Sequence, residues 1–155
     1  MSKILVTGGS GNVGGALARK LVENRNYEVI IADDLSTGSK SKLPSNTYKN
    51  WKFVHCDVNN YKEISELMLV NQFDFVFHYA AVVGVKRTQE NPIAVLNDID
   101  GIRNVLQLSK NSSVKRVFFS SSSEVYGEPV ELPQHELTTP LNSRVPYAVV
   151  KNVGE

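Results

Sequence analysis

A glycine-rich segment near the N-terminus constrains the fold of this chain more than any other feature. The apolar run Ile4-Leu5-Val6 leads directly into Thr7-Gly8-Gly9-Ser10-Gly11-Asn12-Val13-Gly14. Glycine permits a tight turn and a close approach of the backbone to a ligand, and a helix N-terminus offers free amide groups and the positive end of its dipole. The segment therefore predicts a strand–turn–helix unit that binds the pyrophosphate of a dinucleotide; a turn without a ligand is the alternative. The expected contacts are Gly8, Gly11, Asn12, Val13 and Gly14.

The remaining chain alternates short apolar runs with amphipathic segments. Further strands are predicted at 29–32, 51–55, 73–78 and 117–119, and helices from Asn12, over 61–70, from Pro92 toward Val114 and from Tyr147 onward. In the first helix, helical spacing relates Val13, Ala16, Leu17 and Leu21. Residues 35–49 and 120–146 are predicted as loops. The alternation predicts an α/β fold, a doubly wound parallel sheet of the Rossmann type with about five strands, as one domain over residues 1–155.

The composition argues against several classes of partner. Lys and Arg total 17 against 16 Asp and Glu, so the net charge of +1 gives no electrostatic reason to expect nucleic acid or an anionic membrane. Cys56 is the only cysteine, which excludes a disulfide within the chain and is typical of a reduced cytoplasmic protein. No segment has the pattern of a signal peptide or is apolar enough to span a bilayer. We therefore expect a soluble, cytoplasmic protein.

Carboxylates follow the second and third predicted strands. A carboxylate at Asp33-Asp34 can accept hydrogen bonds from both hydroxyls of an adenosine ribose and would repel the 2′-phosphate of NADP. No arginine follows in Ser36-Thr37-Gly38, so NAD is favoured, although Lys40 and Lys42 leave NADP open. Asp57-Val58 suits the adenine ring, with Asp57 as an ordinary turn residue the equal alternative.

A tyrosine and a lysine four residues apart suggest acid–base chemistry. On a helix, Tyr147 and Lys151 would share one face. Because a neighbouring ammonium stabilises a phenolate, we expect Lys151 to lower the pKa of Tyr147. Such a spacing also arises by chance, but the dinucleotide-type turn upstream makes the functional interpretation strong.

Ser120-Ser121-Ser122-Ser123-Glu124 follows the fifth predicted strand. Ligands bind beyond the carboxyl ends of the strands in an open α/β sheet, so a hydroxyl here could contact the oxygen that exchanges its proton with Tyr147. A serine-rich loop that satisfies its own turn is the alternative. His78, at the end of the fourth strand, is predicted to be structural, and no role is predicted for His55 or His135. No His, Cys and Asp cluster has the spacing of a metal site.

Together these motifs resemble the extended short-chain dehydrogenase/reductases, in particular the NAD-dependent nucleotide-sugar epimerase/dehydratase branch. Thr7 to Gly14 resembles the TGGxGxxG turn of that branch, and residues 33–38 resemble the ribose segment of UDP-galactose 4-epimerases. Residues 78–81 resemble its H-x-A-A segment, and residues 120–127 its SSSxxVYG segment. The resemblance implies Ser122 as the active-site hydroxyl, Tyr147 as the acid/base and Lys151 as its partner. It also implies that the cofactor contacts Tyr79, Ala80, Ala81, Ser120, Tyr147 and Lys151.

The sequence departs from that pattern at two places. The family usually has Asn three residues before the helix glycine, whereas Asp98 precedes Gly101 here, which puts one backbone-ordering contact in doubt. Ser123 stands where 4,6-dehydratases have an acid, so dehydration is not expected. Ser122-Ser123-Glu124 is closer to UDP-glucuronate decarboxylases, whereas the ribose segment is closer to 4-epimerases.

The resemblance implies an enzyme that oxidises a nucleotide sugar, most plausibly a UDP-sugar, to a 4-keto intermediate. A 4-epimerase returns hydride to the other face, whereas a decarboxylase first loses carbon dioxide, a step in which Glu124 could assist. A non-catalytic NAD-binding module is the alternative of a different class. The resemblance also implies further strands and a C-terminal sugar-nucleotide domain beyond Glu155, so we expect an N-terminal, inactive part of a longer enzyme. It further implies a homodimer through the helices from Pro92 and Tyr147.

Overall fold

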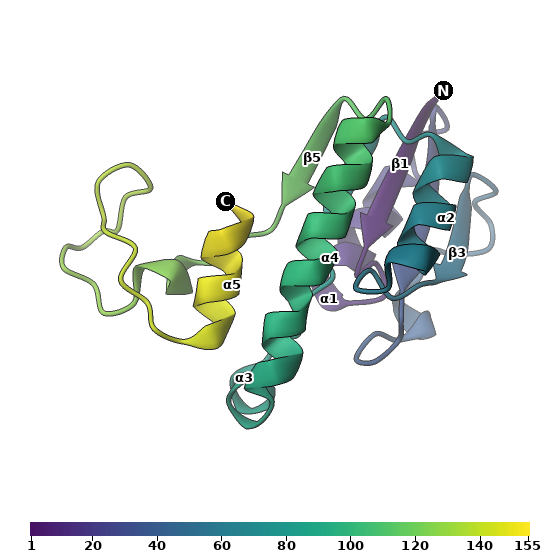
Figure 1. The fold of residues 1–155 in the computed structure, drawn as a ribbon. Coiled ribbons are helices and arrows are strands. Elements are labelled where there is room, and N and C mark those ends of the chain that lie inside the picture. The colour runs from purple at the N-terminus through teal and green to yellow at the C-terminus, as the bar shows by residue number, and fades with distance from the viewer.

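Five short apolar runs form the strands of one parallel sheet. The computed structural model describes residues 1–155, with β1 at Ser2–Thr7, β2 at Tyr27–Asp33, β3 at Trp51–His55, β4 at Phe75–His78 and β5 at Arg116–Phe119. The strand order is β3-β2-β1-β4-β5 (Figure 1). The chain therefore crosses from the β3 edge to the other side of β1, and the order reverses between β1 and β4. In such sheets this reversal opens a crevice at the carboxyl ends of the strands.

Helices cover both faces of this sheet. They are α1 (Asn12–Leu21), α2 (Tyr61–Asn71), α3 (Val85–Glu90), α4 (Pro92–Asn111) and α5 (Pro146–Gly154), with 3₁₀ turns η1 (Lys40–Lys42) and η2 (Ser123–Tyr126). In Figure 1, α2 and α4 lie in front of the sheet and α1 behind it. Helix α5 packs against α4, which brings the C-terminal segment beside the carboxyl end of β5 (Figure 1). No helix combines the length and the apolar character needed to cross a membrane.

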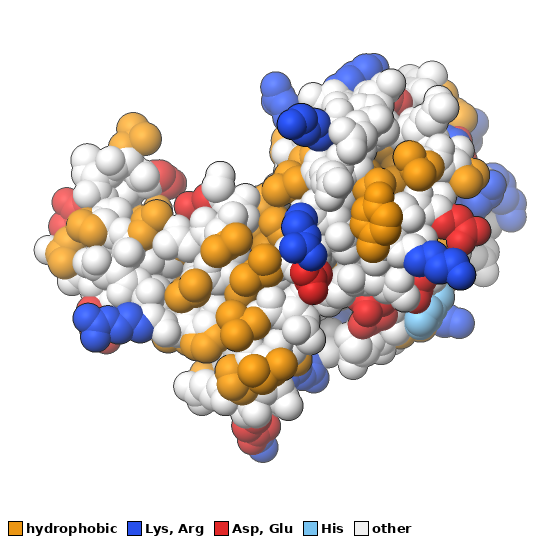
Figure 2. All heavy atoms as spheres, viewed as in Figure 1, with side chains coloured by type: hydrophobic (Ala, Val, Ile, Leu, Met, Phe, Trp, Pro, Cys, Tyr) orange, Lys and Arg blue, Asp and Glu red, His pale blue; other side chains and the backbone are white.

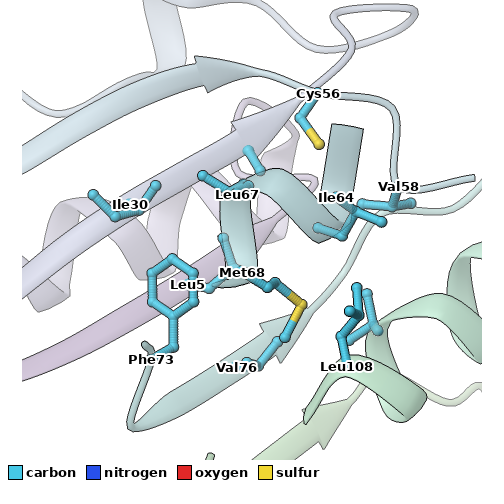
Figure 3. Packing of buried hydrophobic residues seen from close by; sticks show 12 residues of the cluster. Leu5, Ile30, Cys56, Val58, Ile64, Leu67, Met68, Phe73, Val76 and Leu108 are labelled. Atoms are coloured by element: carbon cyan, nitrogen blue, oxygen red, sulfur yellow. The ribbon is translucent and has the colours of Figure 1, made fainter. Parts of the chain in front are cut away.

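The larger hydrophobic core lies between the sheet and the helices α2 and α4. Figure 3 shows strand side chains such as Leu5 and Ile30 facing the side chains of α2. The predicted inward residues of α2, which are Ile64, Leu67 and Met68, are all buried there. This core holds β1 and β4 against α2 and α4, and so fixes the position of the crevice between the two strands.

The opposite face is covered by α1, which approaches the sheet with small residues. Gly14, Gly15 and Ala18 are the buried residues of α1. The helix predicted from the spacing of Val13, Ala16, Leu17 and Leu21 is present, but Val13 and Ala16 are exposed. Because glycine and alanine occupy the buried stripe, the helix axis lies close to the sheet, and Val13 at its first turn faces the crevice instead.

The predicted elements are confirmed, with differences at their ends. Strand β4 begins at Phe75 rather than 73, because Phe73 packs in the core and the Asp74 carboxylate accepts a hydrogen bond from the Lys3 amide at 2.8 Å. Helix α3 was not predicted, since its six residues carry only one buried side chain, Thr88. The two predicted loops each contain a short 3₁₀ turn.

Candidate active site

A cavity of about 520 Å³ lies at the carboxyl ends of the strands. Its walls come from the glycine turn, from the segments after β2, β3, β4 and β5, and from α5. Most of the predicted site residues line it: Gly8, Gly11, Asn12, Val13, Gly14, Asp33, Asp34, Ser36, Thr37, Asp57, Val58, Tyr79, Ala80, Ala81, Ser120, Tyr147 and Lys151. Gly38, Ser122 and Glu124 were also predicted and are not among its lining residues. Residues as far apart in the chain as Gly8 and Lys151 therefore meet at one edge of the sheet.

The glycine turn is shaped by close backbone contacts. Gly8 has a φ of 64°, and a Cβ there would lie 2.6 Å from the Ala80 amide nitrogen. A Cβ on Gly14 would lie 2.4 Å from the Gly8 carbonyl oxygen, so only glycine fits at either position. Helix α1 starts after Gly11 with no side-chain cap, which leaves the amides of its first turn available to an anion.

The two aspartates after β2 have different surroundings. Asp33 is buried, and its Oδ2 and Oδ1 accept hydrogen bonds from the amides of Ser10 at 2.9 Å and Leu35 at 2.8 Å. A Cβ on Gly38 would lie 2.5 Å from Asp33 Oδ1, so this glycine lets the loop close over the carboxylate without itself reaching the cavity. Asp34 is exposed and accepts from the amide and hydroxyl of Ser36. Because each carboxylate oxygen accepts two hydrogen bonds, Asp33 keeps acceptor capacity for a ligand hydroxyl.

Asp57 and Val58 form the cavity wall after β3. Asp57 Oδ1 accepts a hydrogen bond from the Asn59 amide at 2.9 Å, which is the turn role that the sequence left open. Val58 is buried, and its carbonyl accepts from Asn104 of α4 at 3.0 Å. The segment is thus held in place from α4 while it presents one apolar and one acidic side chain to the cavity.

Tyr147 and Lys151 lie on one face of α5, as their spacing predicts. Pro146 occupies the start of the helix, where its missing amide costs nothing, and places Tyr147 in the first turn. Lys151 Nζ lies 5.6 Å from the centre of the Tyr147 ring and 5.0 Å from that of Phe119. It also donates a hydrogen bond to Ser120 Oγ at 3.4 Å. The ammonium group is therefore buried between α5 and the end of β5.

The electrostatics of this pair differ from the expectation. The pKa of Tyr147 is raised, not lowered, because burial disfavours the phenolate and the carboxylates of Glu124 and Asp98 repel it; a hydrogen bond with Ser122 works in the opposite direction. Burial also lowers the pKa of Lys151, whereas the carboxylate of Asp98 raises it. Burial is the largest cause of the shift in the pKa of Tyr147, so its direction follows from packing and not from the spacing of Tyr147 and Lys151.

Ser122 and Glu124 stand at the rim beside Tyr147. Ser122 precedes η2, and its hydroxyl accepts a hydrogen bond from the Glu124 amide at 3.2 Å. The same hydroxyl is the hydrogen-bond partner that lowers the pKa of Tyr147. Glu124 is exposed, and its carboxylate acts on Tyr147 through space. Both residues therefore face the phenol, although neither lines the deeper cavity.

The sequence profile of the NAD dependent epimerase/dehydratase family matches residues 4–155. The chain belongs to this family. It is 33% identical over 154 residues to the UDP-glucose 4-epimerase of Lactobacillus helveticus, covering 99% of this chain and 45% of that protein. It is 40% identical over 127 residues to the UDP-N-acetyl-alpha-D-glucosaminuronate decarboxylase of Bacillus cytotoxicus, covering 81% and 38%.

The solved structures of this family agree with the fold. The UDP-glucose 4-epimerase of Brucella ovis, solved in complex with NAD, superposes with a TM-score of 0.86 at 30% identity, over 99% of this chain and 46% of that one. The chain spans about half the length of the relatives that it matches. The family and the Rossmann-type α/β fold predicted from the sequence are confirmed.

His78 is structural in this family member, as its sequence context predicts. It is buried at the end of β4, its Nδ1 shares a hydrogen bond with the Thr7 hydroxyl at 2.8 Å, and its ring stacks on Phe119. Burial lowers the pKa of His78 to about 3, and the Lys151 ammonium acts in the same direction. Burial raises the pKa of the Cys56 thiol to about 12, so this cysteine is a neutral core residue near neutral pH.

Sequence reasoning missed several residues of the cavity. Val82 and Val83 extend the wall formed after β4, and Lys42 reaches it from η1. Thr7 has an unpredicted role, since its hydroxyl accepts from the amides of Tyr79 and Ala80 at 3.2 Å and so ties that wall to β1. Position after a strand end was the available signal for Val82, and Lys42 had been considered only as a residue that leaves NADP open. Nothing local indicated the role of Thr7.

Proposed function

We propose that this chain is the NAD-binding and acid–base part of a nucleotide-sugar 4-epimerase that acts on a UDP-sugar through a transient 4-keto intermediate. The observation that carries the proposal is that one cavity is lined both by the glycine turn and by Tyr147 with Lys151. A relative named UDP-glucose 4-epimerase supports the reaction class.

The cavity suits NAD at each of its parts. The uncapped amides of α1 and the space left by Gly8 and Gly14 suit a pyrophosphate, which the N-terminal dipole of the helix attracts. The buried carboxylate of Asp33 suits a ribose diol and disfavours a 2′-phosphate. Further along the cavity, Asp57 and Val58 would contact the adenine, and the remaining contacts would come from Asp34, Ser36, Thr37, Tyr79, Ala80, Ala81 and Ser120. Gly38 would act indirectly, by allowing the loop to close over Asp33.

The side chains at the α5 end provide the proton transfers. As the phenolate, Tyr147 takes the proton of the sugar 4-hydroxyl at its Oη while hydride leaves C4, and as the phenol it returns that proton when hydride comes back. Ser122, as a hydrogen-bond partner of Tyr147, is placed to orient that hydroxyl. The buried ammonium of Lys151, 5.6 Å from the centre of the Tyr147 ring, would stabilise the phenolate that must be present before the proton is taken up. The chemistry that bound NAD would supply is reversible hydride transfer with the sugar.

The test is turnover by the full-length protein. Incubation with UDP-glucose should give UDP-galactose, and UDP-N-acetylglucosamine should be tried in parallel. Substrate deuterated at C4 should give product that keeps the label, because the same hydride returns. Product from neither sugar nucleotide, with NAD shown to be bound, would count against the 4-epimerase assignment.

A second candidate is decarboxylation of a UDP-uronate. The observation that favours it is the position of the Glu124 carboxylate, which acts on Tyr147 from the rim, together with the decarboxylase relative from Bacillus cytotoxicus. The full-length protein would then release carbon dioxide from UDP-glucuronate or UDP-N-acetylglucosaminuronate. Absence of labelled carbon dioxide from both carboxyl-labelled substrates would dismiss this candidate.

A non-catalytic NAD-binding module makes the opposite prediction for both assays. It binds NAD and turns over no sugar nucleotide, and Tyr147→Phe changes nothing that can be measured. Loss of turnover on that substitution would reject it.

We also propose that the protein forms a homodimer in the cytoplasm. Hydrophobic side chains gather over α5 and the adjoining part of α4 (Figure 2). Those with substantial exposure are Ile93, Leu96, Leu106, Val149 and Val153. Light scattering on the full-length protein should give twice the monomer mass, and Val153→Lys should shift it toward the monomer.

The single cysteine fits a reducing compartment, which cell fractionation would test.

A further inference from the structure

Asp98 is a buried carboxylate that the proposed mechanism does not use. It lies on α4 with only 8% of its surface exposed and lines the cavity. Its Oδ2 accepts a hydrogen bond from the Val82 amide at 2.6 Å, and the Asn59 side chain is a further hydrogen-bond partner. One carboxylate therefore joins α4 to the segments after β3 and β4. Asp98 therefore makes a contact with the backbone, although it stands where the family usually has asparagine.

Asp98 and Lys151 are the two buried side chains of opposite charge that line this cavity near α5. Lys151 is 3% exposed, and no ion pair within 4.0 Å joins the two groups, so they act on each other through the cavity. Burial raises the pKa of Asp98, whereas the Val82 amide, Asn59 and the Lys151 ammonium lower it. For Lys151, Asp98 is the group that opposes the effect of burial on the pKa.

The other titratable groups around Asp98 do not replace it. Asp57, on the segment after β3, raises the pKa of Asp98. His78, at the end of β4, is neutral near pH 7 because burial lowers its pKa to about 3. Tyr147 on α5 feels the carboxylates of both Asp98 and Glu124, and both raise its pKa. Asp98 is thus the carboxylate that faces both members of the Tyr147–Lys151 pair from across the cavity.

The packing around these groups keeps the interaction strong. Val95 and Ile102 of α4 form a buried cluster with Val150 of α5, and Ile99, Phe119 and Tyr147 pack against it. A wall of apolar side chains lowers the local dielectric, so a single charge is screened less than it would be at the surface.

We propose that Asp98 is a positioning residue that keeps Lys151 protonated beside Tyr147 while it anchors the cavity wall after β4. An asparagine at this position could accept the same hydrogen bond from Val82 but would carry no charge. The inference about turnover rests on the proposed function, whereas the inference about the charge of Lys151 does not.

The direct test is the titration of Lys151 in the full-length protein. Lysine side-chain NMR with ¹³Cε labelling would follow its signal, assigned with Lys151→Met, in wild type and in Asp98→Asn. The asparagine has the shape of the aspartate and should leave the fold intact. We expect the Lys151 signal to titrate about one pH unit lower in this variant. An unchanged titration would overturn the proposal.

Two further variants separate charge from shape. Asp100→Asn removes an exposed acid on the same helix that pairs with Arg103 at 2.6 Å, and should leave the Lys151 signal in place. Asp98→Glu keeps the charge and should titrate closer to wild type than Asp98→Asn does. If Asp98→Glu instead shifts Lys151 as far as Asp98→Asn, shape and not charge is responsible, and the proposal fails.

Turnover gives a second readout. Because Asp98 raises the pKa values of both Tyr147 and Lys151, its replacement by asparagine should move both limbs of the pH profile of kcat/KM to lower pH, with little change in NAD affinity. If Asp98→Asn turns over with the same pH profile as wild type, the inference about Asp98 is contradicted but the proposed function is not. No turnover in wild type would contradict the proposed function, and the NMR titration would still decide the inference.

Discussion

At the glycine-turn end of the cavity the wall is backbone, whereas at the α5 end it is made of side chains. Gly8 and Gly14 are positions where a Cβ would meet a backbone atom at 2.6 and 2.4 Å, respectively. Tyr147 and Lys151 instead project from a helix and are controlled by Ser122, Glu124 and Asp98 through hydrogen bonds and charge. Shape therefore governs one end, and electrostatics governs the other.

This difference separates binding from chemistry. A substitution at the glycine turn changes the space for a ligand, so it should weaken NAD binding and carry turnover down with it. A substitution at the α5 end leaves the pyrophosphate and ribose contacts intact, so it should reduce turnover while NAD still binds. The two ends can be tested against each other with single substitutions that each change a few atoms at one end.

The largest effect is expected for Tyr147→Phe, which removes one oxygen from the α5 end. Without the phenol, no group of comparable position can exchange the proton of the sugar hydroxyl, and turnover should fall about 10²–10⁴-fold. Titration calorimetry with NAD should give an affinity close to that of wild type. A matched loss of NAD affinity would break the comparison, because this end would then also determine binding.

Gly14→Ala is expected to have the next largest effect, and it acts at the opposite end. Its Cβ would lie 2.4 Å from the Gly8 carbonyl oxygen, so the turn must open at a cost of about 1–3 kcal/mol, or roughly ten- to hundred-fold in NAD affinity. Gly15→Ala is the milder neighbour, because its Cβ would lie 3.1 Å from the Lys42 carbonyl oxygen, which needs to move by only a few tenths of an ångström, and alanine favours the helix. Equal NAD affinities for the two variants would contradict a backbone-built site.

Asp33→Ala should have a smaller effect on binding at the same end. The amides of Ser10 and Leu35 lose their acceptor, which costs about 1–3 kcal/mol in stability, and we expect about a ten-fold loss of NAD affinity with a lower melting temperature. Asp34→Ala removes the exposed neighbour, whose bonds go to Ser36, and should change both quantities less. If Asp34→Ala weakens NAD binding more than Asp33→Ala does, the ribose contact has been assigned to the wrong carboxylate.

The two ends also differ in how far the sequence predicts them. The glycine turn is local: strand, turn and helix follow one another within residues 2–21, so their spacing determines the geometry. The direction of the pKa shift at Tyr147 is not local, because burial in the tertiary structure is its largest cause and the carboxylates of Glu124 and Asp98 add to it from η2 and α4. The motif located the tyrosine and lysine, but their surroundings came from tertiary packing. The exposure of Val13 was not predicted either, since small residues form the buried stripe of α1.

His78 connects the two ends and provides the last prediction, which concerns stability and its pH dependence and leaves the cavity lining unchanged. Its ring contacts Thr7 of the glycine-turn side and stacks on Phe119 of the α5 side. Burial lowers its pKa to about 3 in the folded chain, whereas an unfolded histidine titrates near 6.5. Between these values the unfolded state binds more protons, so the free energy of unfolding falls as the pH falls, by at most about 1.4 kcal/mol per pH unit.

His78→Asn removes this titration, while the asparagine can still form a hydrogen bond with the Thr7 hydroxyl. The variant should be less stable than wild type at pH 7, because the stacking on Phe119 is lost, but the difference should narrow as the pH is lowered from 6.5 toward 4. Urea unfolding at each pH measures the difference directly, and the carboxylates common to both proteins cancel from it. If the difference stays constant over this range, His78 binds its proton as readily in the folded chain as in the unfolded one. A charged imidazolium would then be stable beside Lys151, and the lowered pKa of His78 would be contradicted.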